Sequence, residues 1–154
     1  MSGQLVSTLK GKIPQRAIRH LSSLPYAATI QFEAVDFGTP TANLTFNAPS
    51  TLRGKVMNVD LTGVTETFNV TTLEAGIEIG VDGGDTDAYC TTNRGIGALT
   101  AATAQNFNAH DGSLIDGVTE IIPAGGIVTV TPIANTGGTP AGIADLGVTV
   151  FYFE

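Results

Sequence analysis

The sequence predicts an all-β protein, and three observations support this prediction. From residue 28 onward, apolar and polar residues alternate in many short runs, the spacing of a strand with one buried face. The chain has 19 glycines and 7 prolines and is rich in Thr and Val, which is typical of short strands joined by tight turns. Its 154 residues have the size of one domain, and because 42% of them are hydrophobic, disorder is excluded over most of the chain.

The first predicted strand covers residues 28–35. Ile30 and Phe32 lie on one face of this run, and Gln31 and Glu33 lie on the other. The run ends at a segment that contains Gly and Pro, which favour a turn.

Seven further runs show the same alternation, and turn residues separate most of them. They cover residues 43–47, 55–61, 65–71, 73–80, 86–91, 126–134 and 146–153. In the run 55–61, Met57, Val59 and Leu61 share one face. We therefore predict eight strands that pack as two antiparallel sheets in Greek-key order. The side chains that we expect inside are Ile30, Phe32, Val59, Phe68, Ile77, Ile79, Val128, Val130, Val148 and Val150.

A long interval without clear alternation covers residues 92–117. Its Ala-rich part, from Thr100 to Gln105, predicts a single helical turn. Long connections in small β domains often carry function, so we expect subunit contacts in this loop.

Charge divides the chain into two parts. Residues 1–32 contain four basic residues and no acidic one, whereas residues 33–154 contain three basic and fourteen acidic ones, which gives charges of +4 and −11. Residues 1–25 also lack a sustained period of two and contain Pro14 and Pro25. We therefore predict a basic N-terminal arm over residues 1–25 and a β-sandwich domain over residues 26–154.

Three interpretations of the arm remain open: a nucleic-acid tail, a disordered terminus, and an arm that docks on the acidic surface of a partner or sister subunit. Four basic residues without interleaved aromatics are a weak signal for nucleic acid. We favour docking, in which cations set the orientation and aliphatic side chains are buried. The residues that we assign to partner binding are Lys10, Lys12, Ile13, Arg16, Ile18, Arg19, Leu21 and Leu24.

The sequence offers few residues for catalysis or metal binding. The only histidines are His20 and His110, which with Cys90 make three groups scattered along the chain, so we predict no site with the three or four ligands that zinc prefers. Ser113 lies near His110, but its context predicts a surface loop rather than a nucleophile. The acidic segment 82–87 could hold Ca²⁺, although a turn whose carboxylates cap backbone amides is the simpler interpretation. We predict no cofactor, and we expect Cys90 to be a buried apolar residue.

Neither a membrane span nor a signal peptide is predicted. No run reaches the 18 uncharged apolar residues of a spanning helix, and the cations of the arm interrupt any apolar signal segment. We therefore expect the protein to be made and assembled in a cytoplasm, without membrane contact.

Seven segments of the chain resemble one family of viral proteins. Leu-Thr-Phe-Asn-Ala-Pro at 44–49 and Ile-Pro-Ala-Gly-Gly-Ile-Val-Thr-Val-Thr-Pro at 122–132 are the most distinctive, and the others lie at 54–60, 65–68, 77–80, 85–89 and 146–153. Over residues 26–154 the chain resembles the small jelly-roll head decoration, or cement, proteins of tailed bacteriophages. The resemblance implies an eight-stranded antiparallel jelly-roll sandwich with an extended N-terminal arm.

The resemblance also implies a role and a set of partners. Such proteins bind the outside of the capsid, typically as trimers at threefold or quasi-threefold axes, and their arms reach across neighbouring capsomers. The expected partners are the major capsid protein and further copies of this chain, and the expected location is the virion exterior. The alternative is a receptor- or carbohydrate-binding β-sandwich of a phage fibre or lectin type, and an enzyme is the third choice.

The low charge content of the chain predicts self-association. Only 14% of the residues are charged, so eight short strands should leave apolar surface that a monomer cannot cover. We expect light scattering at micromolar concentration to show a stable homo-oligomer, with a trimer as the expected form. A single species with the 15.8 kDa mass of one chain would contradict this prediction.

Overall fold

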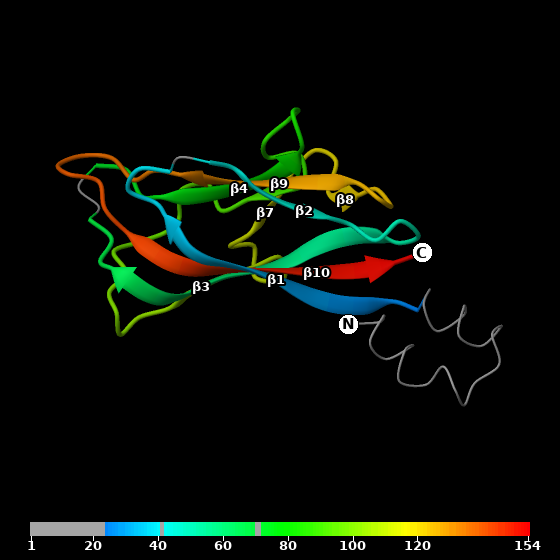
Figure 1. The fold of residues 1–154 in the computed structure, drawn as a ribbon, viewed down its shortest axis with the longest axis horizontal. Coiled ribbons are helices and arrows are strands. Elements are labelled where there is room, and N and C mark those ends of the chain that lie inside the picture. Colours follow the sequence, from blue (N-terminus) through cyan, green and yellow to red (C-terminus); the bar gives the residue numbers. More distant parts are fainter. Residues whose placement is uncertain (1–23, 41, 70–71) are drawn as a thin grey trace.

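Two antiparallel sheets form a sandwich in the computed structural model, which describes residues 24–40, 42–69 and 72–154 (Figure 1). The first sheet has the strand order β1-β10-β3-β6, and β8 also pairs with β3; the second sheet has the order β2-β9-β4-β5-β7. The strands are β1 (Tyr26–Asp36), β2 (Leu44–Asn47), β3 (Arg53–Glu66), β4 (Gly76–Val81), β5 (Cys90–Thr91), β6 (Gln105–Asn108), β7 (Ile115–Asp116), β8 (Ile121–Ile122), β9 (Ile127–Ile133) and β10 (Ile143–Phe153).

The strands pair in a nested order. β1 pairs with β10, β2 with β9, β3 with β6 and β4 with β5, all antiparallel. Eight strands that pair from the two ends of the chain inward in this way form a jelly roll. The predicted all-β, antiparallel jelly-roll sandwich is therefore confirmed, and β7 and β8 are two-residue additions to it.

The core lies between the two sheets. Eight of the ten side chains that the sequence places inside are buried: Val59, Phe68, Ile77, Ile79, Val128, Val130, Val148 and Val150. The other two, Ile30 and Phe32 on β1, are partly buried and pack against the same core. The alternation identified the core correctly because each strand has one face toward the opposite sheet.

Met57 departs from the predicted pattern, because it is 38% exposed although Val59 and Leu61 are buried. The register between β3 and β10 shifts at this point: Asn58 lies opposite Thr149, and Val56 lies opposite Val150. Met57 is thus the extra residue of a β-bulge, which turns Val56 rather than Met57 toward the core.

Two predicted strands are shorter than the alternation indicated. The run 65–71 is not a separate strand, since residues 65 and 66 end β3 and residues 70–71 lie outside the described residues. In the run 86–91 only Cys90 and Thr91 form a strand. The preceding turn packs on Gly80, where an added Cβ would lie 2.0 Å from the carbonyl oxygen of Asp85. The chain returns to β4 only at Tyr89, whose amide donates to the carbonyl of Ile79.

The structure differs most from the predicted topology in the long loop, residues 92–117, which contains two strands. Residues 92–117 contain β6, which completes the first sheet, and β7, which pairs with β5. Phe107 on β6 is buried, so one apolar side chain in a polar segment anchors the strand. The predicted helical turn from Thr100 to Gln105 is wrong: the amide of Thr103 donates to the carbonyl of Thr100 in a tight turn, and Gln105 starts β6.

A buried charge in β9 should prevent folding. Val130 is fully buried and lies between Leu44 and Ile79 in the second sheet. Val130→Asp should abolish soluble expression, because an unpaired buried carboxylate costs several kcal/mol and such a domain is stable by only about 5–15 kcal/mol. Ile127→Asp in the same strand is the control, since Ile127 is exposed. Soluble, folded Val130→Asp protein would refute the core assignment.

Candidate interaction surfaces

The predicted arm lies almost entirely outside the described residues. Lys10, Lys12, Ile13, Arg16, Ile18, Arg19 and Leu21 fall within residues 1–23, so their assignment to partner binding stays a prediction. Leu24 is described and is 41% exposed, just before β1. Because Tyr26 lies opposite Tyr152 on β10, the arm joins the first sheet at the end where the chain finishes (Figure 1).

The domain has three cations, Arg53, Lys55 and Arg94, against fourteen acidic residues. Arg94 donates hydrogen bonds to the carbonyl oxygens of Glu74 and Ala134, so it ties the end of the 92–117 loop to the second sheet. Among the described residues, only Lys55 forms ion pairs. The described surface is therefore predominantly anionic.

Lys55 fixes the loop between β7 and β8. Its ammonium group donates to Asp116 and to Glu120, at 3.1 Å each. These two hydrogen bonds, that to Asp116 first, raise the pKa of Lys55 above its ordinary value. The carbonyl of Ala88 accepts hydrogen bonds from the amides of Thr119 and Glu120 as well.

Val118 lies at the tip of this loop, where it is 96% exposed. Gly117, beside it, approaches residue 88 so closely that an added Cβ would lie 2.3 Å from the carbonyl oxygen of Ala88. Glu120 adopts a left-handed φ of 57°, a conformation that costs about 1 kcal/mol for a residue with a side chain. The loop is thus held in one shape by contacts at its base while its apolar tip is exposed.

A second exposed apolar surface lies at the end of β10. Phe151 and Phe153 stack with ring centroids 6.0 Å apart, and the guanidinium of Arg53 lies 5.1 Å from the Phe153 centroid. Arg53 also donates to the backbone carbonyl of Glu154 at 2.5 Å. We call Arg53, Phe151 and Phe153 the terminal patch. Arginine stacked on exposed aromatic rings is a combination enriched in protein interfaces.

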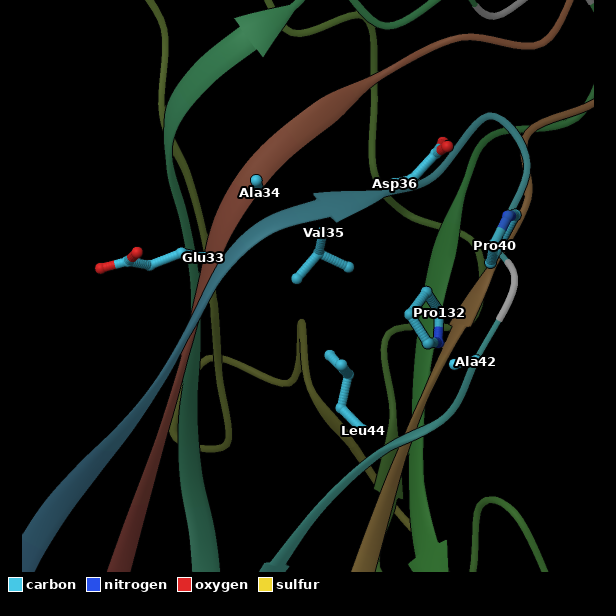
Figure 2. A pocket seen from close by; sticks show the side chains of 8 residues that line it. All are labelled: Glu33, Ala34, Val35, Asp36, Pro40, Ala42, Leu44 and Pro132. Carbon is cyan, nitrogen blue, oxygen red and sulfur yellow. The ribbon is translucent and has the colours of Figure 1, made fainter.

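A small cavity of about 180 Å³ lies between the end of β1 and β2. Val35 and Leu44 point toward each other across it, and Glu33 points away (Figure 2). The nearby carboxylate of Asp36 accepts hydrogen bonds from the amides of Thr39 and Gly38, and these hydrogen bonds, that from Thr39 first, lower its pKa. The cavity therefore lies between the first sheet, to which β1 belongs, and the second sheet, to which β2 belongs.

The other groups considered from the sequence form local turns. The hydroxyl of Ser113 donates to Asp111 at 2.6 Å rather than to His110. The segment 82–87 forms the predicted turn, but a backbone hydrogen bond from the amide of Val81 to the carbonyl of Asp85 closes it, and the carboxylate of Asp82 accepts from the hydroxyl of Thr129. The described residues contain no group of three or more His, Cys, Asp or Glu side chains arranged to hold a metal ion.

Cys90 is buried, as predicted. Burial raises the pKa of its thiol to about 12, so the thiolate that reacts with oxidants is scarce near neutral pH. The described part of the chain also contains no helix with the length and apolar character that a membrane crossing requires.

No protein-family model matches the chain. No curated protein matches it. Among solved structures, a chain described as "Cyanophage Pam1 capsid asymmetric unit" is similar, with a TM-score of 0.36 and 17% sequence identity, over 85% of this chain and 84% of that chain.

The terminal patch was not among the sequence-based candidates. The sequence did contain a pattern that indicates this patch, because the alternation that places Val148 and Val150 inside places Phe151 and Phe153 outside. The contribution of Arg53 could not be read from the sequence, since it depends on the pairing of β3 with β10.

Removing the Lys55 ammonium should loosen the loop without unfolding the domain. The partners are partly exposed, so Lys55→Met should lower the free energy of unfolding by only about 0.5–1 kcal/mol. The amides of Thr119 and Glu120 should exchange faster with deuterium. Because the pKa of Lys55 is raised, its stabilising contribution is present below the ordinary value of 10.5 and is lost as the pH rises through the raised value.

The wild type and Lys55→Met should therefore differ in stability below the ordinary Lys pKa of 10.5 and converge as the pH rises through the raised pKa of Lys55. Glu74→Gln is the matched control, because it removes one exposed charge outside the loop between β7 and β8. Unchanged exchange at Thr119 and Glu120 in Lys55→Met would show that backbone hydrogen bonds alone hold the loop.

Proposed function

We propose that this chain is a head decoration, or cement, protein of a tailed bacteriophage, which binds the outside of the capsid as an oligomer and stabilises the shell. The observation that carries the proposal is the nested pairing from β1 with β10 to β4 with β5. This is the strand order that the family resemblance of residues 26–154 leads us to expect. Because a fold alone does not determine function, the surface must also suit the role.

The surface chemistry suits a binding role. The polar groups that a hydrolase would use are engaged in turns, such as Ser113 with Asp111. The apolar groups are displayed instead, at Val118 on a fixed loop and at Phe151, which stacks on the Phe153 ring that Arg53 covers. Exposed apolar side chains on well-held backbone are the usual anchors of protein interfaces.

The charge distribution supports an electrostatic role for the arm. The four cations of residues 1–25 contrast with the anionic domain, and the arm joins that domain at Leu24, at one end of the first sheet. In this proposal the cations orient the arm on an acidic surface of the major capsid protein, and Ile13, Ile18, Leu21 and Leu24 supply buried apolar area. The oligomer, expected to be a trimer, presents several arms at once, which raises the avidity for a symmetric shell.

Sedimentation with purified undecorated shells tests the proposal. The full chain should pellet with the shells. A variant that lacks residues 1–23 keeps all the residues that the structure describes. It should bind the shells about tenfold more weakly or worse, which corresponds to a loss of about 1.4 kcal/mol in binding free energy. A thermal melt that matches the full chain would show that the domain is intact.

Charge reversal separates the contribution of the cations from that of the apolar side chains. Replacing Lys10, Lys12, Arg16 and Arg19 with Glu should make the residual binding less sensitive to salt, because these cations are assigned the screened part of the attraction. Unchanged affinity of the truncated chain would show that the arm is passive. Glycan binding without sedimentation would favour the carbohydrate-binding alternative.

A further inference from the structure

The apolar core is incompletely covered along one side of the sandwich. Seven partly buried apolar residues pack against the core, and all but Ala109 belong to β1 or β2. The six are Tyr26, Ala28, Ile30, Phe32, Leu44 and Phe46, and we call them the β1–β2 seam. β1 and β2 are the outer strands of their sheets, and the cavity between Val35 and Leu44 lies on this side as well (Figure 2).

The edge of β1 has little protection against association. No strand within the described residues pairs with its outer edge, and the sequence from Tyr26 to Phe32 contains no charge and no proline. Soluble proteins usually blunt such an edge with charges, prolines or an early bulge. Here the bulge comes only after Phe32. An apolar seam beside an uncharged edge of this length requires a covering partner.

Glu33 provides a charge at the end of the seam. Its side chain is exposed, and within the described residues its carboxylate has no hydrogen bond or ion pair. Asp36, the other carboxylate at the cavity, is already occupied by Gly38 and Thr39. A partner that covers the seam would therefore place a cation opposite Glu33.

The terminal patch has the complementary chemistry. Arg53 makes one hydrogen bond within the described residues, whereas Arg94 serves two carbonyls and Lys55 two carboxylates, so Arg53 keeps the most donors free. Phe151, which stacks on the Phe153 ring next to Arg53, is exposed and apolar.

The patch lies beside the start of β1, where Ala27 is opposite Phe151, whereas Glu33 and the cavity lie toward the other end of β1. The two charged groups are therefore at opposite ends of the strand, which is the arrangement that a head-to-tail interface needs.

We propose that the β1–β2 seam of one copy binds the terminal patch of a second copy, with Glu33 of one copy paired to Arg53 of the next. Each copy has one seam and one patch, so the contact is head-to-tail and repeats from copy to copy; a closed ring, such as the expected trimer, requires that the rotation between copies closes. This inference rests on the proposed function, because it names the surface that forms the oligomer. Burial of Phe151 against Phe32 and Leu44 would supply the apolar part of the contact, and the ion pair would fix its register.

Reciprocal charge reversal tests the proposal by light scattering on the full chain. The wild type should have the mass of an oligomer, whereas Glu33→Arg and Arg53→Glu should each dissociate at least tenfold more readily, toward the 15.8 kDa chain. The double variant Glu33→Arg/Arg53→Glu should regain the oligomer, because each interface again joins opposite charges. Phe151→Ser should dissociate without any change of charge.

Val118→Ser is the matched control, since Val118 is the most exposed large apolar side chain in the described residues and lies in neither surface. Its mass should equal that of the wild type. All substituted residues are exposed, so thermal melts should show folded domains throughout. A monomeric wild type, single variants that keep the oligomer, or a double variant that stays dissociated would each overturn the inference.

The outcome is separable from that of the proposed function. If the wild type sediments with shells but the Glu33 and Arg53 variants keep the mass of the wild type, the capsid role stands and this interface is rejected. Dissociation by the single variants and recovery in the double variant, without shell binding by the wild type, would establish the interface and reject the capsid role.

Discussion

β10 hydrogen-bonds to β1 on one side and to β3 on the other, so β1 joins the first sheet only through this last strand. The second sheet has the same dependence, since β9 lies between β2 and β4. Both connecting strands come from the C-terminal part of the chain. The core residues Val128, Val130, Val148 and Val150 therefore join segments that are far apart in sequence, which makes loop-closure entropy the main barrier to folding.

The surfaces of the domain follow from the same pairing. β10 sets Phe151 and Phe153 beside β3, so that Arg53 reaches the Phe153 ring, and it also fixes where the arm enters at Tyr26. β3 in turn pairs with β8, which places Lys55 next to Glu120 in the fixed loop. The candidate interface groups are thus positioned by the central strands of the first sheet and not by their own local sequence.

The alternation predicted the sheets well because burial on one face imposes a period of two wherever a strand crosses the core. It failed where another constraint acted: a bulge turned Met57 outward, and the turn over Gly80 shortened the run 86–91. β6 was missed because Gln-Asn-Phe-Asn has low strand propensity, and its pairing with β3 stabilises it. The ion pairs of Lys55 join residues more than sixty positions apart, so no local pattern could reveal them.

Cys90 gives the domain one further property. The chain has a single cysteine, which is buried and whose thiol is almost entirely protonated near neutral pH, and no covalent cross-link holds the two sheets together within the chain. The described residues are held by apolar burial, hydrogen bonds and the ion pairs of Lys55, none of which changes with redox potential. The packing between the two sheets is therefore insensitive to the change from a reducing cell interior to an oxidising medium outside it.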